Sequence, residues 1–325
     1  MVEQELFDTV ASETWARPGS GDDAAALVAF LGSKGLPARI VSLARADELR
    51  AELEGRHAGG ELDEGFHREC LTQLAFTPPD DFPDARSIVV AAVPRPETAA
   101  VFEVGGVARK LTIPPTYTDY HVITRRWLEW LGAILAGAGY RAAGTVLPLK
   151  LLATRSGLAA YGRNNISFVP GLGSYFELVA AYTDIPCPSH DWKQPAMLDR
   201  CLGCHACVNS CPTGAIRRDR FLLATERCLV LHNERPGEVP FPGWIDRSAH
   251  RTLIGCMECQ WVCPENRGFR GWVGSTESFS ADETGALMAG AHPADLQAET
   301  VTKLQRLGLL RFEGLLERNL NAALL

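Results

Sequence analysis

The sequence lacks the short motifs that identify many nucleotide-using and hydrolytic enzymes. Its 325 residues contain no G-x-G-x-x-G after a strand, no P-loop, no G-x-S-x-G and no H-E-x-x-H. These absences argue against a Rossmann-type nicotinamide or flavin site, a phosphate-binding loop, a serine-hydrolase elbow and a zincin metal site. A redox cofactor, if the protein has one, must be bound in another way.

The sequence also lacks a net positive charge and long apolar runs. The net charge of −7 provides no global basic field that would attract nucleic acid or an anionic membrane. The longest clean apolar run, residues 87–93, has the length of a buried strand and falls far short of the roughly 18 residues that cross a bilayer. Residues 1–5 are acidic and lack the regions of a secretory signal. We therefore expect a cytoplasmic protein without a membrane partner.

Cysteine, in contrast, is abundant. Ten cysteines in a reducing compartment favour metal or redox chemistry over disulfides. Residues 201–212 follow the bacterial ferredoxin spacing C-x2-C-x2-C-x3-C-P, and residues 256–264 read C-x2-C-x3-C-P. Cys228 lies between the two groups and brings the number of cysteines to eight. The pattern predicts a module with two [4Fe-4S] clusters.

In such modules the fourth cysteine of each motif ligates the other cluster. We therefore predict the ligands of cluster one as Cys201, Cys204, Cys207 and Cys263. The predicted ligands of cluster two are Cys211, Cys228, Cys256 and Cys259. Zinc sites also take thiolates in sets of four, but zinc motifs seldom follow this spacing. Cys70 and Cys187 are expected to be small buried side chains.

Hydrophobic periodicity outside the module predicts an α/β domain ahead of it. The expected helices cover residues 22–32, 46–57, 118–138 and 151–161, and the expected strands cover 38–44, 87–93, 165–169 and 175–182. The last two strands are expected to pair around the Gly-rich turn at 170–174. Residues 265–281 are expected to form a loop, with helices following at 294–308 and 312–324.

The predicted fold class is therefore α+β, with three parts in sequence order. An α/β domain occupies residues 1–185, a bacterial-ferredoxin-like two-cluster module occupies 186–270, and C-terminal helices that pack back on the core occupy 271–325.

Several further segments occur in the order of a known family pattern. They are F-P-D-A-R-S-I-V-V at 82–90, D-Y-H at 119–121, R-S-G-L-A-A-Y-G-R-N at 155–164, T-D-I-P at 183–186, the cysteine module, and R-N at 318–319. With these segments the chain resembles the epoxyqueuosine reductases over residues 80–325. That family consists of cobalamin-dependent enzymes of the last step of queuosine biosynthesis in tRNA, and it is related to the reductive dehalogenases.

The resemblance implies that a nitroreductase-like α/β domain holds cobalamin against the clusters, and that the nearer cluster reduces it. It also implies a set of residues that bind the cofactor: Asp119, Tyr120, His121, Arg163, Asn164, Ser167, Ser174 and Leu178. The alternative is that Gly157, Gly162 and Gly173 merely shape turns.

The chain departs from the family pattern at the proton donor. The Asp that precedes the R-S-G-L helix in the family falls on Ala143 here, and no Asp or Glu lies between Glu129 and Glu177. Tyr161 is a candidate replacement acid, and Lys150 is a candidate contact to substrate or cofactor. A packing role for Tyr161 and a solvated Lys150 are the alternatives. The family's Lys is replaced by Arg163, which keeps the charge but is no proton source.

These observations predict a cobalamin- and [4Fe-4S]-dependent reductase of a small-molecule or modified-nucleoside substrate. Its reductant is expected to be a carrier such as ferredoxin or flavodoxin. One alternative is a true epoxyqueuosine reductase with a relocated acid. Another is a corrinoid-reducing electron-transfer protein without its own substrate. A tRNA partner is possible but disfavoured, since the charge is negative and the sequence ends at Leu325 without the helical-repeat extension of many of the tRNA enzymes.

Overall fold

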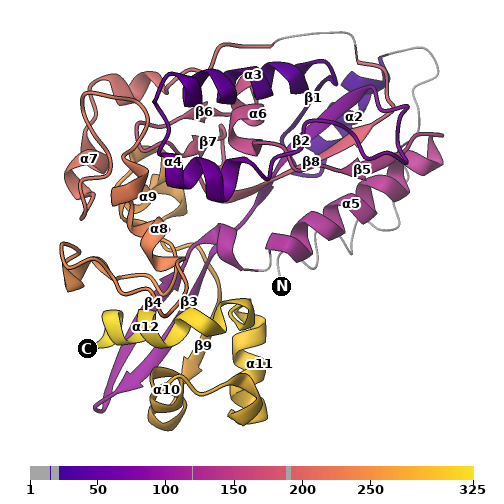
Figure 1. Cartoon of the computed structure of the whole chain (residues 1–325). Helices are drawn as coiled ribbons and strands as arrows, with labels where there is room; N and C mark the ends of the chain where they lie inside the picture. Colours follow the sequence, from indigo (N-terminus) through magenta and orange to yellow (C-terminus); the bar gives the residue numbers. More distant parts are fainter. Residues whose placement is uncertain (1–14, 16–21, 119, 188–191) are drawn as a thin grey trace. The chain divides into compact units, whose positions relative to one another are not determined.

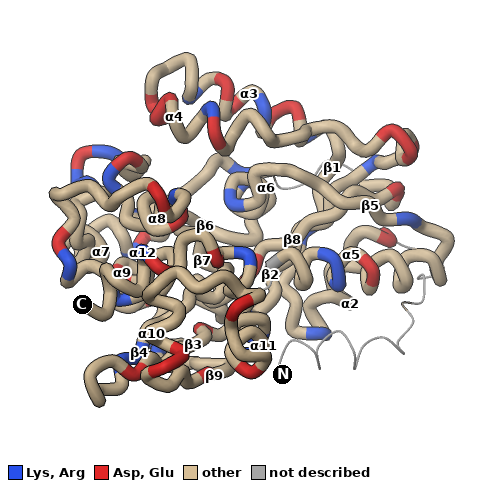
Figure 2. The backbone as a smooth tube through the Cα atoms, turned by 60° about the horizontal axis from the view of Figure 1, so that its bottom comes forward, with Lys and Arg blue, Asp and Glu red and all other residues tan. Residues whose placement is uncertain are grey.

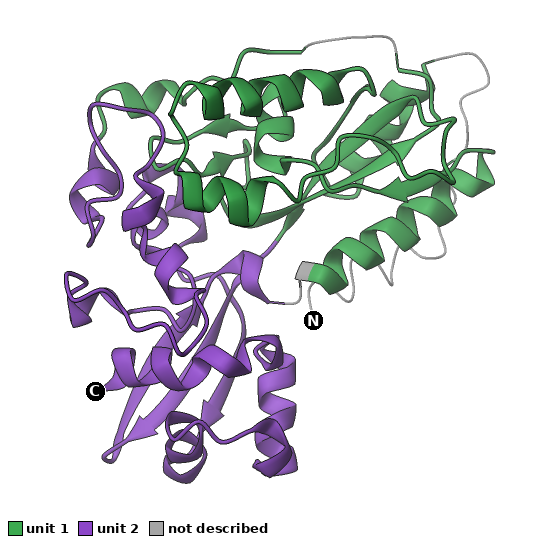
Figure 3. Cartoon of the chain, viewed as in Figure 1, with its two compact units in different colours: residues 1–94, 121–204 green, residues 95–120, 205–325 purple. Residues whose placement is uncertain are grey.

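The chain forms two compact units, shown in different colours in Figure 3. This computed structural model describes residues 15, 22–118, 120–187 and 192–325. Unit 1 comprises residues 1–94 and 121–204, and unit 2 comprises residues 95–120 and 205–325. The chain therefore leaves unit 1, returns to it and leaves it again, whereas the sequence suggested three consecutive parts.

Unit 1 is built on a four-stranded sheet. Its strands are β1 (Ala38–Ser42), β2 (Ser87–Pro94), β8 (Phe176–Thr183) and β5 (Ala142–Gly144), in that order. All three pairings are antiparallel, although the alternation of helices and strands suggested an α/β domain. The observed class is mixed α+β.

Helices cover both faces of this sheet. One face packs on α2 (Asp23–Ser33) and α5 (Tyr120–Gly137), and the other on α3 (Arg45–Ala58) and α6 (Leu149–Arg155). Figure 1 shows α3 and α5 on opposite sides of the sheet. The first seven residues of β2 are buried, as expected for an apolar strand covered on both faces. The predicted helices and strands in this part of unit 1 are confirmed to within a few residues.

The segment after α6 differs from the prediction. The helix expected over 151–161 ends at Arg155, because Gly157 adopts a φ of +74° and turns the chain. Two short strands follow, β6 (Ala160–Tyr161) and β7 (Ser167–Phe168), and they pair with each other. The predicted pairing of 165–169 with 175–182 is therefore wrong, since β8 is already paired with β2 and β5.

Unit 2 contains a three-stranded sheet that the sequence analysis missed. The hairpin of β3 (Glu97–Val104) and β4 (Val107–Ile113) turns at two glycines with φ of 57° and 77°. A Gly-Gly pair between strands is a hairpin signal, so this one was available in the sequence. β9 (Val273–Phe279) pairs with β3 in parallel, and this overturns the loop expected over 265–281.

Three helices contribute to the hydrophobic core of the unit 2 sheet. They are α10 (Ala281–Met288), α11 (Ala298–Arg306) and α12 (Glu313–Leu324). The last two correspond to the predicted C-terminal helices, and α10 was not predicted.

The remaining elements are short. The α-helical ones are α4 (Glu64–Phe66), α7 (Ala206–Ser210), α8 (Leu229–Asn233) and α9 (Glu258–Trp261). A π-helical turn forms η1 (His67–Leu71). The 3-10 turns are η2 (Pro115–Tyr117), η3 (Asp199–Leu202), η4 (Thr225–Arg227), η5 (Arg247–Ala249), η6 (Pro264–Phe269), η7 (Pro293–Asp295) and η8 (Leu310–Phe312). Within the described ranges, no helix combines the length and apolarity needed to cross a bilayer.

Candidate functional site

The eight cysteines of the module lie on short helical turns and the loops that join them. Cys201 and Cys204 fall in the sequence range of unit 1, and the other six fall in unit 2. Within unit 2, α7 and α9 pack against each other, and the Ser210 hydroxyl donates to the Glu258 carbonyl at 3.4 Å. All eight cysteines are half-buried and none forms a disulfide. Free thiols at partly covered positions suit metal ligation.

Three of the predicted ligands of cluster two interact electrostatically. Burial raises the pKa of the Cys228 thiol, and the neighbouring Cys211 raises it further. Burial also raises the pKa of Cys256 to about 12, with smaller contributions from Cys228 and Cys211. Thiols that raise one another's pKa lie close together, and a bound metal ion would compensate their negative charges. These residues therefore fit a thiolate-ligated cluster.

A clamp from α12 holds the loops that carry these cysteines. Asn319 is buried and donates to the carbonyls of Asn233 and Leu253 at 2.9 and 3.1 Å. Asn233 in turn donates to the carbonyl of Gly255 at 2.7 Å. The guanidinium of Arg318 donates to four carbonyls between residues 232 and 239. The Arg318-Asn319 segment noted in the sequence thus fixes the chain after Cys228 and before Cys256.

In unit 1, the chain leading to Cys201 runs beside β6. The Tyr161 amide donates to the carbonyl of Ala196 at 3.0 Å, and the Leu198 amide donates to the carbonyl of Tyr161 at 2.8 Å. Two residues further along, Nη2 of Arg163 donates to the carbonyl of Cys201 at 3.1 Å. The segment predicted to bind a cofactor is therefore attached to the first predicted cluster ligand.

Most of the predicted cofactor-binding residues of this segment are buried together in unit 1. Asn164, Ser167, Ser174 and Leu178 are at most 8% exposed. Within the described ranges, neither the Ser167 hydroxyl nor Nε of Arg163 has a hydrogen-bond partner. Unsatisfied buried polar groups are rare and costly, and they are expected where a polar ligand binds. These residues fit a cofactor that presents hydrogen-bonding groups.

Gly162 makes this arrangement possible. A Cβ atom at this position would lie 2.5 Å from both Oδ1 of Asn164 and the ring of Phe168. The glycine is therefore required by close packing between β6 and β7, where the sequence analysis had left open a simple turn-forming role.

The phenol of Tyr161 lies in a different environment from the one predicted. It hydrogen-bonds with Thr154 and feels the charges of Glu52 and Arg56. Burial raises its pKa to about 12, which makes the phenol a weaker acid. Arg163, two residues further along the chain, donates to the Cys201 carbonyl.

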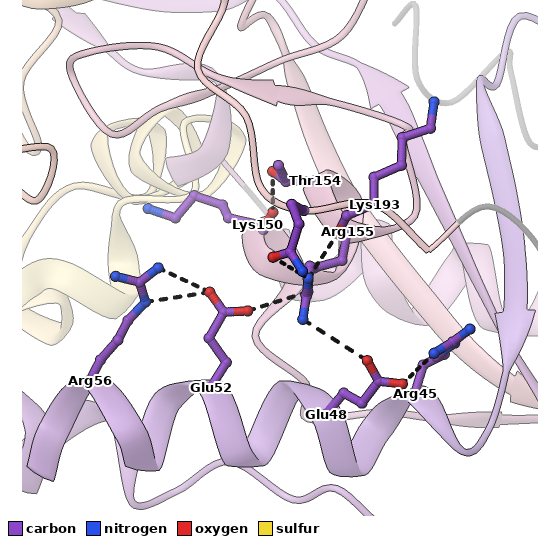
Figure 4. A network of polar contacts seen from close by, with 9 residues as sticks. Arg45, Glu48, Glu52, Arg56, Lys150, Thr154, Arg155 and Lys193 are labelled. Atoms are coloured by element: carbon purple, nitrogen blue, oxygen red, sulfur yellow. Dashed lines mark hydrogen bonds and ion pairs between the residues drawn. The ribbon is translucent and has the colours of Figure 1, made fainter.

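Arg155 is the centre of a polar network that the sequence analysis did not predict (Figure 4). Its Nε lies 3.3 Å from Oε2 of Glu52 on α3, and its Nη1 donates at 3.0 Å to the carbonyl of Lys193 and to Oε1 of Gln194. Glu52, Arg155 and Gln194 line part of an open cavity of about 590 Å³ beside α3. Lys150 is exposed on α6, and its side chain extends away from Arg155 in Figure 4.

A second buried phenol was overlooked. Ala143, the position of the missing acid, pairs with Tyr182 in the sheet. Tyr182 is 1% exposed, its hydroxyl has no hydrogen-bond partner within the described part of the chain, and burial raises its pKa to about 12. Alternation along β8 was the signal that could have placed it on the face of Leu178 and Ala180.

The remaining candidates are less well placed or lie outside the description. Asp119 is outside the described residues, as is the side chain of Tyr120, and His121 is exposed at the start of α5. In unit 2, the Tyr117 hydroxyl donates to Oε1 of Glu234. One burial expectation also fails, because Cys70 is exposed.

Known proteins resemble this chain both in the cysteine module and over a longer stretch. A family model described as a 4Fe-4S double cluster binding domain matches residues 200–266. The chain is 32% identical to the epoxyqueuosine reductase of Staphylococcus aureus over 234 residues, which are 68% of this chain and 58% of that protein.

Solved structures show the same fold. The chain matches the Bacillus subtilis epoxyqueuosine reductase, solved with an aspartate catalytic loop swung out of the active site, with a TM-score of 0.65 and 23% identity. It matches an epoxyqueuosine reductase bound to an epoxyqueuosine-modified tRNA-Tyr stem loop with a TM-score of 0.63 and 23% identity. Both alignments cover 92% of this chain and 80% of the other.

Fold and cysteines together define an iron–sulfur protein with a double cluster domain. More particularly, the chain is a relative of the epoxyqueuosine reductases, as its collinear segments predicted. It spans 58% of the length of the Staphylococcus aureus protein, so its own activity has to be argued from its site.

Proposed function

We propose that this protein is a reductase that uses two [4Fe-4S] clusters and a corrinoid. The observation that supports this most directly is the hydrogen bond from Arg163 to the Cys201 carbonyl, at 3.1 Å. It joins a segment with unsatisfied buried polar groups to a predicted cluster ligand. Electron transfer between two centres needs a short path between them, and a cluster next to a cofactor-binding segment provides one.

The residues that would hold the corrinoid are the buried set of unit 1. The unsatisfied Ser167 hydroxyl and the Arg163 guanidinium would hydrogen-bond polar groups at the edge of the macrocycle, and Leu178 would provide apolar contact. When bound, the corrinoid would supply a low-potential metal centre, while the protein supplies binding and orientation.

The cluster ligands are proposed as two crossed sets. Cluster one takes Cys201, Cys204, Cys207 and Cys263. Cluster two takes Cys211, Cys228, Cys256 and Cys259, and the electrostatic interaction of the first three supports this set.

Anaerobic binding of cobalamin to the reconstituted holoprotein tests the proposal. We expect saturable binding with about one cobalamin per chain, and a change in its visible absorption when the clusters are reduced. S167A should weaken binding, because it removes the unsatisfied hydroxyl, whereas a matched S33A variant on the surface of α2 should not. A holoprotein with intact clusters that binds no cobalamin would sink the proposal.

Epoxyqueuosine in tRNA is a second candidate substrate, favoured by the sequence similarity to the Staphylococcus aureus enzyme. Expression in a queuosine-deficient strain distinguishes the alternatives. Queuosine in the tRNA would identify this activity, whereas persistent epoxyqueuosine would point to another substrate. Reduction of a partner corrinoid protein without a small-molecule product would identify an electron-transfer role instead.

The proton donor is proposed to be a tyrosine, because Ala143 cannot act as an acid. Tyr161 and Tyr182 are both buried phenols of unit 1, and Tyr182 lies opposite Ala143 on the neighbouring strand. Comparison of Y161F and Y182F assigns the role: the donor variant should lose turnover while keeping cobalamin binding.

The reductant is proposed to be an acidic one-electron carrier such as ferredoxin or flavodoxin. Arg217, Arg218 and Arg220 are exposed on the loop that follows α7, where Figure 2 shows basic segments, and Arg227 stacks on the 44% exposed Trp244. A local basic patch on an acidic protein would attract such a carrier.

Ten free cysteines support a reducing, cytoplasmic location.

A further inference from the structure

Three side chains that can bind metal meet beyond the end of α3, at residues that have no part in the proposed function. They are His57 in the last turn of α3, Glu64 at the start of α4, and His67 at the start of η1. Their donor atoms all lie within 4.8 Å of one another, and His57 Nε2 lies 2.8 Å from Glu64 Oε2. The two imidazole rings stack with 3.5 Å between centroids and 6° between planes.

The local backbone brings these residues together. After α3, Gly60 adopts a φ of +68° and reverses the chain. The Asp63 carboxylate then caps α4 by accepting from the Phe66 amide at 2.8 Å. Glu64 and His67 are three residues apart on the helical turn that follows, so their side chains share a face. His67 begins a π-helical turn, a rare geometry that is frequent at functional sites.

The charges of the cluster suit a cation better than they suit a simple ion pair. Glu64 offers a carboxylate oxygen 2.8 Å from His57 Nε2, and His67 adds a second imidazole within 4.8 Å of both. A simple ion pair with Glu64 would need one imidazole, whereas two lie here with 3.5 Å between their centroids. A metal ion, in contrast, uses both imidazoles in the neutral form together with the carboxylate.

We propose that His57, Glu64 and His67 bind a divalent transition metal ion, with zinc as the best match. Two imidazoles and one carboxylate form a known three-residue zinc ligand set that leaves one position for water. With metal–ligand bonds of about 2.0–2.1 Å, tetrahedral donors are roughly 3.3 Å apart. The donors must therefore move closer, and one imidazole must turn out of the stack so that both nitrogen lone pairs point at the ion. The side chains of His57 and Glu64, 34% and 73% exposed, have the freedom to do so.

A metal at this position would tie the end of α3 to η1. The same helix carries Glu52 and Arg56, which belong to the network around Arg155. The site would therefore stiffen the helix that anchors the segment leading to β6, without contacting the cofactors.

Equilibrium dialysis of the untagged holoprotein against zinc tests the site, with metal content measured by mass spectrometry. We expect about one zinc ion per chain at unchanged iron content. H67A and E64Q should weaken binding by more than the roughly 10–100-fold that follows loss of an outer-shell partner. E69Q is the matched control, because Glu69 is an exposed carboxylate on the same turn that pairs with Arg68 at 3.8 Å, and this variant should bind zinc like the wild type.

X-ray absorption at the zinc edge separates this site from the cysteines. We expect nitrogen and oxygen neighbours at about 2.0–2.1 Å and no sulfur at about 2.3 Å. A sulfur neighbour of the zinc would overturn the proposal. So would the absence of zinc binding to the holoprotein, or unchanged zinc binding in both H67A and E64Q. Intact cluster absorption in each variant verifies that it has folded.

Discussion

Nη2 of Arg163 donates a hydrogen bond to the carbonyl of Cys201 at 3.1 Å. Arg163 follows β6, and Cys201 lies in η3, so the two residues are 38 positions apart in the chain. Two backbone hydrogen bonds join the same segments: the Tyr161 amide donates to the Ala196 carbonyl, and the Leu198 amide donates to the Tyr161 carbonyl. One end of the segment predicted to bind a cofactor is thus tied to the first predicted cluster ligand.

Arg163→Ala should lower the reduction potential of the cluster that Cys201 ligates. A cation near a cluster favours the reduced, more negative state, and at an effective dielectric constant of about 20 its removal is worth roughly 1–2 kcal/mol, or tens of millivolts. Potentiometric titration monitored by electron paramagnetic resonance measures this shift. R163K, which keeps the charge, should change the potential less, and equal potentials in all three proteins would contradict the assignment.

Cys228→Ser should remove one cluster and leave the other. We predict that Cys228 completes the set with Cys211, Cys256 and Cys259, because the second motif supplies one thiol too few. Reconstituted C228S should therefore hold about half the iron of the wild type. C187S is the control, since Cys187 packs against the core of unit 1 and lies outside both cysteine motifs. Full iron content in C228S would show that another residue completes the set.

Arg155→Ala should destabilise unit 1 by about 2–4 kcal/mol. The side chains of Arg155 and Glu52 are 11% and 15% exposed, and removal of Arg155 leaves the Glu52 carboxylate with Arg56 as its remaining partner. R50A is the matched control, because Arg50 and Asp47 form an exposed pair that should contribute at most about 1 kcal/mol. Denaturant unfolding of the anaerobic holoproteins compares them, and equal losses would mean that the network is not stabilising.

Reversal of charge at Arg217 and Arg218 should slow reduction by an acidic carrier about tenfold or more and flatten its dependence on ionic strength. Stopped-flow kinetics with a reduced ferredoxin measures both effects. Reduction by dithionite should stay unchanged, as should carrier kinetics in the R125E control, which alters an exposed pair on α5. Unaltered carrier kinetics in the double variant would place the docking surface elsewhere.

The contact between Glu283 and Lys303 should make the helices of unit 2 sensitive to acid. Burial by itself would raise the pKa of Glu283, but hydrogen bonds from Lys303, the Ser280 backbone and Thr300 outweigh it and lower the pKa from 4.5 to about 2. Because the folded pKa lies below the unfolded one, the stabilisation is complete above about pH 4.5 and is lost as the pH falls towards 2.

We expect this contribution to be about 1–2 kcal/mol, since water still reaches the pair. Hydrogen exchange of α10 and α11, corrected for intrinsic rates, should show less protection in E283Q than in the wild type at pH 6. The difference should shrink on acidification below pH 4.5. A difference that stays constant between pH 6 and pH 3 would contradict this origin.

Local patterns in the sequence predicted much of unit 1. The apolar run of β2 requires cover on both faces, and α5 shows its buried stripe at helical spacing, so both follow from residues close together in the chain. Pairing between distant segments could not be predicted in this way. β9 pairs with β3 although more than 160 residues separate them. β7 does not pair with β8, because both edges of β8 are already paired, with β2 and β5.

By itself, the sequence determined that the chain carries an iron–sulfur module, because thiol spacing along a short segment decides what a cysteine module can ligate. The match to a 4Fe-4S double cluster binding domain confirms this prediction. Only the tertiary structure decided the surroundings of the other candidates. In the folded chain, Tyr161 hydrogen-bonds with Thr154 and feels the charge of Glu52. Arg163 donates to the Cys201 carbonyl, and Tyr182 pairs with Ala143 on the neighbouring strand. These relationships depend on strand pairing and burial, through which residues far apart in the chain share one environment.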